Sequence, residues 1–272
     1  MRKNGIRTLW EKGSPALNGW LSIANPFSAE IMAAQGYDSI TIDLQHGIVD
    51  YRDAVAMMQA MRASEVTPLC RVPWLDAGAI MKVLDAGAYG VVCPMINNRA
   101  DAEKLVSYMR YPPVGCRSFG PSRAVFSAGS DYGSHADGEV LCFAMIETRE
   151  GFDNVADIAA TPGLDGLYIG PADLTLGLAG RAYATGFDRT EPAMVEAIRH
   201  ILSTARDAGI KAALHCGSAE YAAKAVAWGF DMVTVSNDVR LLAGAAAASV
   251  AAFRKLSVGD LSASQQTAAS GY

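Results

Sequence analysis

Long apolar runs and clusters of basic residues are both missing from this sequence. No stretch approaches the roughly 18 uninterrupted apolar residues of a membrane span, so none is expected. The N-terminal MRKNGIRTLWEKG also lacks the apolar segment of a signal peptide, and we expect a cytoplasmic protein. Lys and Arg number 23 against 28 Asp and Glu, a formal net charge of −5. Because nucleic-acid binding depends on basic patches, no nucleic-acid partner is expected.

Charged residues are scarce overall, at 19% of the chain, whereas hydrophobic residues make up 51%. This composition excludes a disordered protein, and 272 residues fit either one (β/α)8 barrel or two small domains. The five cysteines are an odd number, and none belongs to a CxxC pair. Several stand inside apolar runs, so we expect reduced, buried thiols.

A repeated junction organises the chain: a helix-like stretch ends near a glycine, and a short apolar run follows. The junctions are 33–38, 85–90, 161–166 and 227–231. With four further runs they predict strands at 16–23, 39–43, 67–72, 91–94, 140–146, 167–170, 210–215 and 232–235. Apolar strands that alternate with helices are typical of parallel βαβ units, so we predict an α/β fold, a single (β/α)8 TIM barrel over 1–256. An open doubly wound sheet is disfavoured because no GxGxxG motif follows the first strand.

Three segments stand apart from this pattern. Residues 110–139 are rich in Pro, Gly and Ser, which is typical of an active-site lid or a subunit-contact loop. Residues 239–256 form a predicted Ala-rich helix that we expect to pack against, or exchange with, a neighbouring subunit. The polar tail 257–272 is predicted to be disordered.

Reactive groups of such barrels project from the carboxyl ends of the strands. Glu147 and Asp173 follow adjacent strands, and two carboxylates suit a hard cation such as Mg²⁺ or Mn²⁺. Each also has a structural explanation, since Glu147 can open a helix and Asp173 can cap one. His46 follows another strand and can equally be a packed loop histidine, and His215 ends the seventh strand. Arg71 favours a site more strongly, because a guanidinium that ends a buried strand needs an anionic partner.

The turn Gly170-Pro171-Ala172-Asp173 offers backbone N–H groups at a helix start, which can hold a carboxylate. Together with a cation, this predicts a chelating 2-oxo acid as ligand. A Schiff-base aldolase would need a lysine at the same end of the barrel. None of the seven lysines is well placed, so metal-assisted enolisation is favoured over imine chemistry.

Taken together, these segments resemble the HpcH/HpaI aldolase family of class II pyruvate aldolases, which includes 4-hydroxy-2-oxoheptanedioate aldolase. The matching segments run in order from residue 18 to residue 174: Asn18-Gly19-Trp20, Ile42-Asp43-Leu44-Gln45-His46-Gly47, Arg71-Val72-Pro73, Tyr111-Pro112-Pro113, Gly115-Cys116-Arg117, Ile146-Glu147-Thr148 and Gly170-Pro171-Ala172-Asp173-Leu174. The resemblance implies a barrel with an exchanged helix, a hexamer built as a trimer of dimers, and a divalent ion (Mg²⁺, Mn²⁺ or Co²⁺). It further implies cleavage or formation of 4-hydroxy-2-oxo acids through a pyruvate-type enolate, with a 2-oxo acid and an aldehyde as partners.

The resemblance also implies roles for single residues. Glu147 and Asp173 match metal ligands, His46 the general base and Arg71 the residue that stabilises the enolate. The backbone of Ala172 and Asp173, in the turn that Gly170 and Pro171 begin, matches the donor-carboxylate site. Asp85 matches an acid that raises the basicity of the histidine. Gln45 and Met145 depart from the family pattern, where glutamate and glutamine often stand.

Further residues are supporting candidates. Asp43 and Gln45 neighbour the predicted base, whereas Arg117 and Arg123 lie in segment 110–139. The two arginines can bind the distal carboxylate of a dicarboxylic substrate or serve a subunit interface. The alternative activity is an oxaloacetate decarboxylase, or a condensing lyase of the macrophomate synthase kind, with the same metal enolate. A non-catalytic metabolite-binding barrel is the remote alternative.

Overall fold

Eight parallel strands close into a barrel in the order β1 to β8, which confirms the predicted (β/α)8 architecture. The computed structural model describes the backbone of residues 1–268 and the side chains of residues 1–256. The strands are β1 Ala16–Leu21, β2 Ser39–Asp43, β3 Thr67–Arg71, β4 Gly90–Cys93, β5 Leu141–Ile146, β6 Gly166–Ile169, β7 Lys211–Cys216 and β8 Met232–Val235. Each predicted strand is present, with bounds shifted by no more than two residues.

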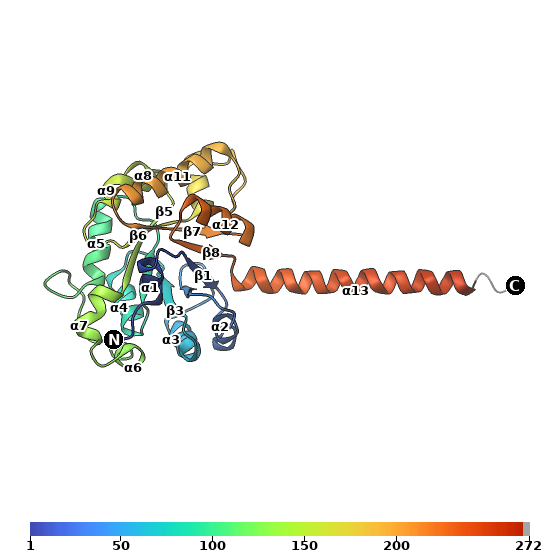
Figure 1. Ribbon diagram of the computed structural model, residues 1–272, viewed down its shortest axis with the longest axis horizontal. Helices are drawn as coiled ribbons and strands as arrows, with labels where there is room; N and C mark the ends of the chain where they lie inside the picture. Colours follow the sequence, from blue (N-terminus) through green and yellow to red (C-terminus); the bar gives the residue numbers. More distant parts are fainter. Residues whose placement is uncertain (269–272) are drawn as a thin grey trace.

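Helices surround the barrel, apart from the last one, α13, which extends away from it (Figure 1). They are α1 Gly5–Glu11, α2 Pro26–Ala33, α3 Tyr51–Ala60, the 3-10 turn η1 Met61–Ala63, α4 Ala77–Asp85, α5 Arg99–Met109, α6 Ala124–Ala128, α7 Tyr132–Glu139, α8 Arg149–Asp153, α9 Val155–Ala159, α10 Pro171–Ala179, α11 Pro192–Asp207, α12 Ala219–Trp228 and α13 Asp238–Ala268. Two of them, α6 and α7, lie within segment 110–139, which is thus partly helical. Helix α1 was not predicted; its Ile6 is buried in the barrel interior, and Leu9 and Trp10 pack beside it.

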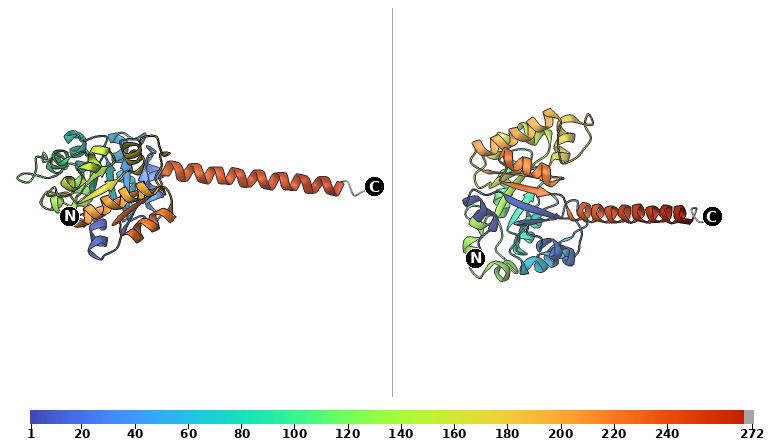
Figure 2. Two further views of the ribbon diagram at one scale, coloured as in Figure 1. Left: turned by 90° about the horizontal axis from the view of Figure 1, so that it is seen from above. Right: turned by 45° about the vertical axis from the view of Figure 1, so that its right-hand side comes forward.

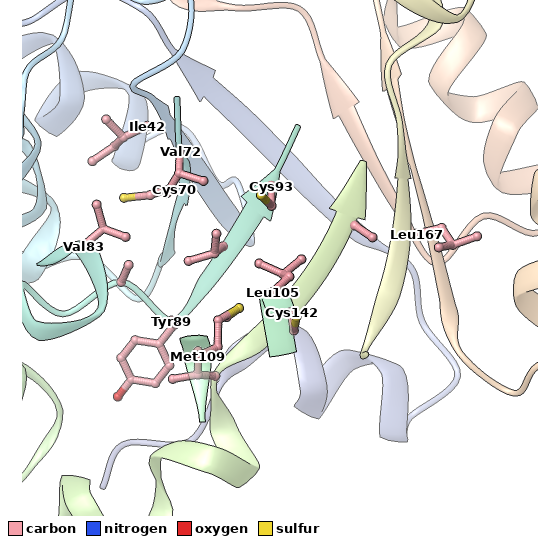
Figure 3. Packing of buried hydrophobic residues seen from close by; sticks show 14 of the residues in the cluster. Ile42, Cys70, Val72, Val83, Tyr89, Cys93, Leu105, Met109, Cys142 and Leu167 are labelled. Carbon is pink, nitrogen blue, oxygen red and sulfur yellow. The ribbon is translucent and has the colours of Figure 1, made fainter. Parts of the chain in front are cut away.

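Side chains form two apolar cores because successive strand residues point to opposite faces. One core fills the barrel interior and includes Trp20, Phe143 and Tyr168. The larger core lies between the strands and the surrounding helices. In Figure 3, Leu105 and Met109 of α5 belong to this outer layer with Cys93 and Cys142 of β4 and β5. Cys70 and Cys216 are buried as well, so four of the five free thiols are buried, as predicted, and only Cys116 is exposed.

Helix α13 leaves the barrel instead of covering it (Figures 1 and 2). It extends over 31 residues, and its side chains from Val239 to Leu256 are exposed. In a closed barrel, the helix after β8 is expected to cover the seam between β8 and β1. That seam carries an open apolar groove of about 430 Å³ here, between the end of α2 and α12. Within the described residues, no helix is both long and apolar enough to cross a bilayer.

The helix continues to Ala268, past the boundary at 256 that the sequence predicted. The predicted disordered tail 257–272 falls partly on residues outside the described part of the chain, and it stays a prediction.

Candidate active site

A cavity of about 360 Å³ opens at the carboxyl ends of the strands. Its lining comes from seven of the eight strand ends and the loops or helix starts that follow them, with β4 as the exception. The lining residues are Trp20, Ser22, Asp43, His46, Arg71, Met145, Gly170, Ala172, Asp173, Phe187, His215, Asn237, Val239 and Arg240. No lysine lines it, in agreement with the argument against a Schiff base. The cavity therefore brings together His46, Arg71 and three residues of the turn 170–173, Gly170, Ala172 and Asp173.

Asp43 is the anionic partner that Arg71 requires. Its two carboxylate oxygens accept hydrogen bonds from Arg71 Nε at 2.8 Å and Nη2 at 2.6 Å. Trp20 Nε1 donates to the same carboxylate at 3.2 Å, and the Arg71 guanidinium lies 4.8 Å from the Trp20 ring. Burial alone would raise the pKa of Asp43, but the hydrogen bonds and charge of Arg71 hold it below its usual value. Asp43 thus fixes the Arg71 side chain. The sequence had indicated Asp43 only as a neighbour of His46, not as the partner of Arg71.

The same carboxylate shapes the loop that carries His46. Asp43 Oδ1 accepts the backbone N–H groups of Gln45 at 3.0 Å and His46 at 3.2 Å. A Cβ at Gly47 would lie 2.3 Å from the carbonyl oxygen of Asp43, so only glycine fits this turn. His46 is exposed at the cavity wall, and its ring makes no hydrogen bond to a described residue. Gln45 Oε1, by contrast, is buried without a partner among the described residues.

Glu147 points into the protein and does not open the next helix. Thr148 caps α8 instead, and Glu150 is the acidic residue of its first turn. Glu147 Oε1 accepts the backbone N–H of Met95 at 2.9 Å, and Met95 adopts the left-handed conformation at φ 57°. A non-glycine residue in that region costs of order 1 kcal/mol, and such strain clusters at functional sites. Burial, with the charge of Asp173, outweighs the Met95 bond and raises the pKa of Glu147 to about 7.

The turn after β6 begins α10 with Gly170 as its N-cap and Pro171 as its first helical residue. Asp173 is therefore not the cap, and its carboxylate makes no hydrogen bond to a described residue. A Cβ at Gly170 would lie 2.6 Å from Glu147 Oε2 and 2.6 Å from Met145 Cε. This glycine is needed for space, since it lets the Glu147 carboxylate pack directly against the backbone of the turn.

The carboxylate pair fits a divalent cation of the Mg²⁺ type. Glu147 and Asp173 repel each other across a partly buried space, a repulsion that a bound cation would remove. Within the described residues, no group of three His, Cys, Asp or Glu side chains could hold a metal. Two carboxylates are the protein ligands Mg²⁺ typically takes, with water and substrate oxygens at its other positions, whereas a structural zinc site needs four protein ligands.

Asp85, Arg117 and Arg123 lie away from the cavity of their own chain, whereas a subunit interface, the other role predicted for the two arginines, stays a prediction. Asp85 ends α4, which runs back from the cavity toward the start of β4, and none of the three residues lines the cavity. Arg117 donates to Asp85 Oδ1 at 2.6 Å and lies over the Tyr111 ring, with its guanidinium carbon 4.5 Å from the centroid. Arg123 donates to the carbonyl oxygen of Ala86. Within one chain, the two arginines cannot meet a substrate in this cavity, and Asp85 cannot reach His46.

Other cavity residues escaped the sequence analysis. Trp20, Phe187 and Arg240 had no predicted role, and His215 was noted only as a strand end. Trp20 could have been predicted, because alternate residues of β1 point into the barrel and Trp20 is one of them. Phe187 lies in the loop 180–191 and Arg240 in the first turn of α13, where no sequence signal distinguishes them from surface residues. The Arg240 guanidinium lies 5.3 Å from the Phe187 ring at the cavity rim.

A histidine, an arginine and carboxylates around a cavity at the carboxyl ends of a closed barrel are typical of a barrel enzyme. A model of the HpcH/HpaI aldolase/citrate lyase family matches residues 18–245. A hydroxypyruvate/pyruvate aldolase of Rhizorhabdus wittichii is 41% identical over 253 residues, which cover 93% of this chain and all of the relative. A 4-hydroxy-2-oxo-heptane-1,7-dioate aldolase of Salmonella arizonae is 33% identical and covers 92% of this chain and 95% of its own.

Among solved structures, an HpcH/HpaI aldolase/citrate lyase family protein from Burkholderia cenocepacia has a TM-score of 0.85 at 31% identity, over 93% of this chain and 100% of that one. The chain therefore belongs to the HpcH/HpaI aldolase/citrate lyase family, as its motifs predicted. It is an aldolase of the carbon–carbon lyase class.

Proposed function

We propose that this enzyme is a metal-dependent aldolase that cleaves or forms 4-hydroxy-2-oxo acids, with pyruvate or hydroxypyruvate as donor. The observation that carries the proposal is the convergence of His46, Arg71 and the turn 170–173 on one cavity, with Glu147 packed against Gly170. The names of the two relatives above support the same reaction class.

The donor binds through its carboxylate to the backbone of Ala172 and Asp173. Gly170 begins this turn without a side chain, and Pro171 has no N–H, so the following N–H groups at the positive end of α10 are left for a ligand. Arg71 keeps Nη1 free of hydrogen bonds to described residues, because Asp43 takes only Nε and Nη2. The ion pair with Asp43 orients this Nη1 amino group, whose two N–H donors offset the negative charge that develops on the 2-oxo oxygen.

His46 moves the proton at C3 of the donor. Its exposed ring has no internal hydrogen bond, so it is available as a base, and the two backbone bonds to Asp43 hold its loop. The enolate carbon then bonds to the carbonyl carbon of the aldehyde, or the reverse sequence breaks that bond. Glu147 and Asp173 would hold a divalent cation, which when bound supplies a Lewis acid that lowers the cost of enolate formation.

The test is release of pyruvate from 4-hydroxy-2-oxo acids, with Mg²⁺, Mn²⁺ or Co²⁺ added after exhaustive chelation. We expect activity to vanish on chelation and to return with a metal, and Arg71→Ala to lose turnover. Full activity in the chelated enzyme, or in Arg71→Ala, would refute the proposal. Pyruvate release from oxaloacetate but from no 4-hydroxy-2-oxo acid would favour the decarboxylase alternative.

We also propose that α13 is exchanged between copies within a hexamer. Support comes from the uncovered seam groove, lined by Leu17, Tyr37 and Val233 among others, and from the exposed apolar side chains of α13. These side chains are Val239, Leu241, Leu242, Val250, Phe253 and Leu256. A helix of another copy would cover both surfaces at once. Leu242→Asp together with Phe253→Asp should yield smaller species in sedimentation analysis, and an unchanged assembly would contradict the exchange.

Assembly bears on Asp85 as well. Because Asp85 lies outside the cavity of its own chain, the basicity role implied by the family applies only to His46 of a neighbouring copy. Mixed oligomers of His46→Ala and Asp85→Ala chains should then recover activity that neither homo-oligomer has. If mixing restores none, Asp85 serves only to hold Arg117.

A further inference from the structure

A line of buried polar side chains crosses the barrel interior and ends at His215. Asn18 Nδ2 donates to Thr234 Oγ1 at 2.8 Å, Thr234 Oγ1 lies 2.6 Å from Tyr168 Oη, and Tyr168 Oη lies 3.2 Å from His215 Nδ1. At its other end, Asn18 Oδ1 accepts the hydroxyl groups of Ser39 and Thr41. The line therefore connects β1, β2, β8, β6 and β7 beneath the cavity.

The acceptors available along this line assign the direction of its hydrogens. Thr234 Oγ1 already accepts from Asn18, so its own hydrogen goes to Tyr168 Oη, and the Tyr168 hydrogen goes to His215 Nδ1. The opposite direction would leave the Thr234 hydrogen without an acceptor among the described residues. With Nδ1 as acceptor, an uncharged imidazole carries its hydrogen on Nε2.

His215 Nε2 is buried and has no hydrogen-bond partner among the described residues. The residue is 94% buried, and its ring centroid lies 4.8 Å from that of Trp20 and 4.5 Å from that of Phe187, yet His215 lines the cavity. Burial, together with the charge of Arg71, lowers the pKa of His215 to about 3, so the ring is uncharged at any working pH. Buried donors without partners are rare in native proteins, and a site that leaves one in its wall indicates a ligand acceptor.

His215 comes from β7, a different strand from those that supply the proposed donor site. The proposed function already assigns the donor oxygens to the turn 170–173, to Arg71 and to the carboxylate pair. His215 lines the same cavity, with Phe187 and Arg240 also in its lining. The oxygen of a 4-hydroxy-2-oxo acid without an assigned partner is the one on C4, which derives from the aldehyde.

We propose that His215 binds the aldehyde-derived oxygen of the substrate by donating its Nε2 hydrogen, and that the line Asn18–Thr234–Tyr168 holds the tautomer which makes this possible. The inference rests on the proposed aldolase function and assigns an acceptor-binding residue within it. His215 is not a base here, because Nδ1, the only nitrogen of this tautomer with a lone pair in the ring plane, already accepts from Tyr168.

Two amides at position 215 separate the hydrogen bond from the packing. In His215→Asn the amide can still accept from Tyr168 but places nothing at Nε2, whereas His215→Gln can place an N–H donor there. Loss of one hydrogen bond predicts a fall of about ten-fold in kcat/KM for the aldehyde in His215→Asn, and a fall of at most about three-fold in His215→Gln. Exchange of the pyruvate C3 protons with D₂O, which needs no aldehyde, should stay within about two-fold of wild type in both variants.

Equal losses in the two variants, no loss in His215→Asn, or a parallel loss of proton exchange would each overturn the proposal. ¹⁵N NMR of histidine-labelled wild-type enzyme tests the tautomer without any substitution: we expect Nε2–H, and a ring protonated on Nδ1 would refute it. The proposed function fails separately, if wild-type enzyme neither exchanges pyruvate protons nor turns over any aldehyde.

Discussion

Replacing Asp43 by asparagine should separate the two tasks of this buried carboxylate, stability and organisation of the site. Asp43 accepts five hydrogen bonds, from Arg71 Nε and Nη2, Trp20 Nε1 and the backbone of Gln45 and His46. Its side chain is only 2% exposed and that of Arg71 9%. Asparagine keeps the shape but leaves the Arg71 charge buried without a counter-ion, which costs about 3 kcal/mol of unfolding free energy.

Activity should fall further than stability alone explains. A freed Arg71 and a loosened His46 loop misplace two groups that act on the same donor, so we expect kcat/KM to fall about 100-fold. The assay is pyruvate release together with urea unfolding. Since the folded-state pKa of Asp43 is lowered, its stabilising effect is present above its unfolded value of about 4 and is lost as pH falls through the folded pKa. The stability difference between wild type and Asp43→Asn should therefore shrink on acidification below about pH 4.

Asp165→Asn is the matched control. Asp165 also holds two arginines, accepting from Arg7 at 2.5 Å and Arg110 at 2.8 Å, and it accepts the backbone N–H of Cys142 at 2.8 Å. It precedes β6 and so lies at the other end of the barrel from the cavity. Asp165→Asn should lose stability but keep kcat/KM within about two-fold. Wild-type kcat/KM in Asp43→Asn, or an equal loss of activity in both variants, would refute the positioning role of Asp43.

Three further predictions concern the rest of the site. Gly170→Ala should lower kcat/KM at least about ten-fold, because its Cβ would displace Glu147. The control is Gly138→Ala in α7, where a Cβ meets nothing within 4 Å, and it should change neither kcat/KM nor the free energy of unfolding. Equal effects of the two substitutions on kcat/KM would contradict the packing of Glu147 against Gly170. Because the pKa of Glu147 is raised to about 7, its ionised carboxylate destabilises the chelated enzyme increasingly from about pH 4.3 to pH 7. The free energy of unfolding of Glu147→Gln should therefore exceed that of wild type by up to about 3 kcal/mol at pH 8 and by little at pH 4, and a difference that does not change with pH would contradict this. The same variant should be inactive and should no longer be stabilised by Mg²⁺. Because Arg240 lines the cavity and Arg123 does not, we expect Arg240, not Arg123, to attract the distal carboxylate of an aldehyde that carries one. Arg240→Leu should lower kcat/KM for succinic semialdehyde relative to propanal about five-fold, while Arg123→Leu leaves that ratio unchanged. A ratio altered equally by both variants would contradict this role of Arg240.

The order of strands and helices could be predicted from the sequence because local patterns encode it. Each strand is a short apolar run, four of the eight runs follow a glycine junction, and both faces of such strands are buried in a barrel. The motifs also indicated that His46, Arg71, Glu147 and Asp173 follow or end strands on one face of the barrel, since chain order places the carboxyl ends of parallel strands together; their roles stay predictions. The role of Arg117 in segment 110–139 could not be predicted in the same way. The side chains that hold it, Asp85, Tyr111 and Tyr132, come from separate segments of the chain.

The sequence alone was enough to predict the barrel and the enzyme family, because these follow from the periodicity of apolar residues and from the motifs next to the strand ends. The hydrogen-bond partner of each side chain could be known only from the folded structure. Asp43 became the counter-ion of Arg71 because neighbouring strands pair Asp43 with Arg71 in register. Asp85 lies away from the cavity because it ends α4, which runs opposite to the strands, and Arg117 pairs with it there. The hydrogen bonds from which we infer the tautomer of His215 involve residues of four other strands. Such partners are distant in the chain, and no local pattern of residues specifies them.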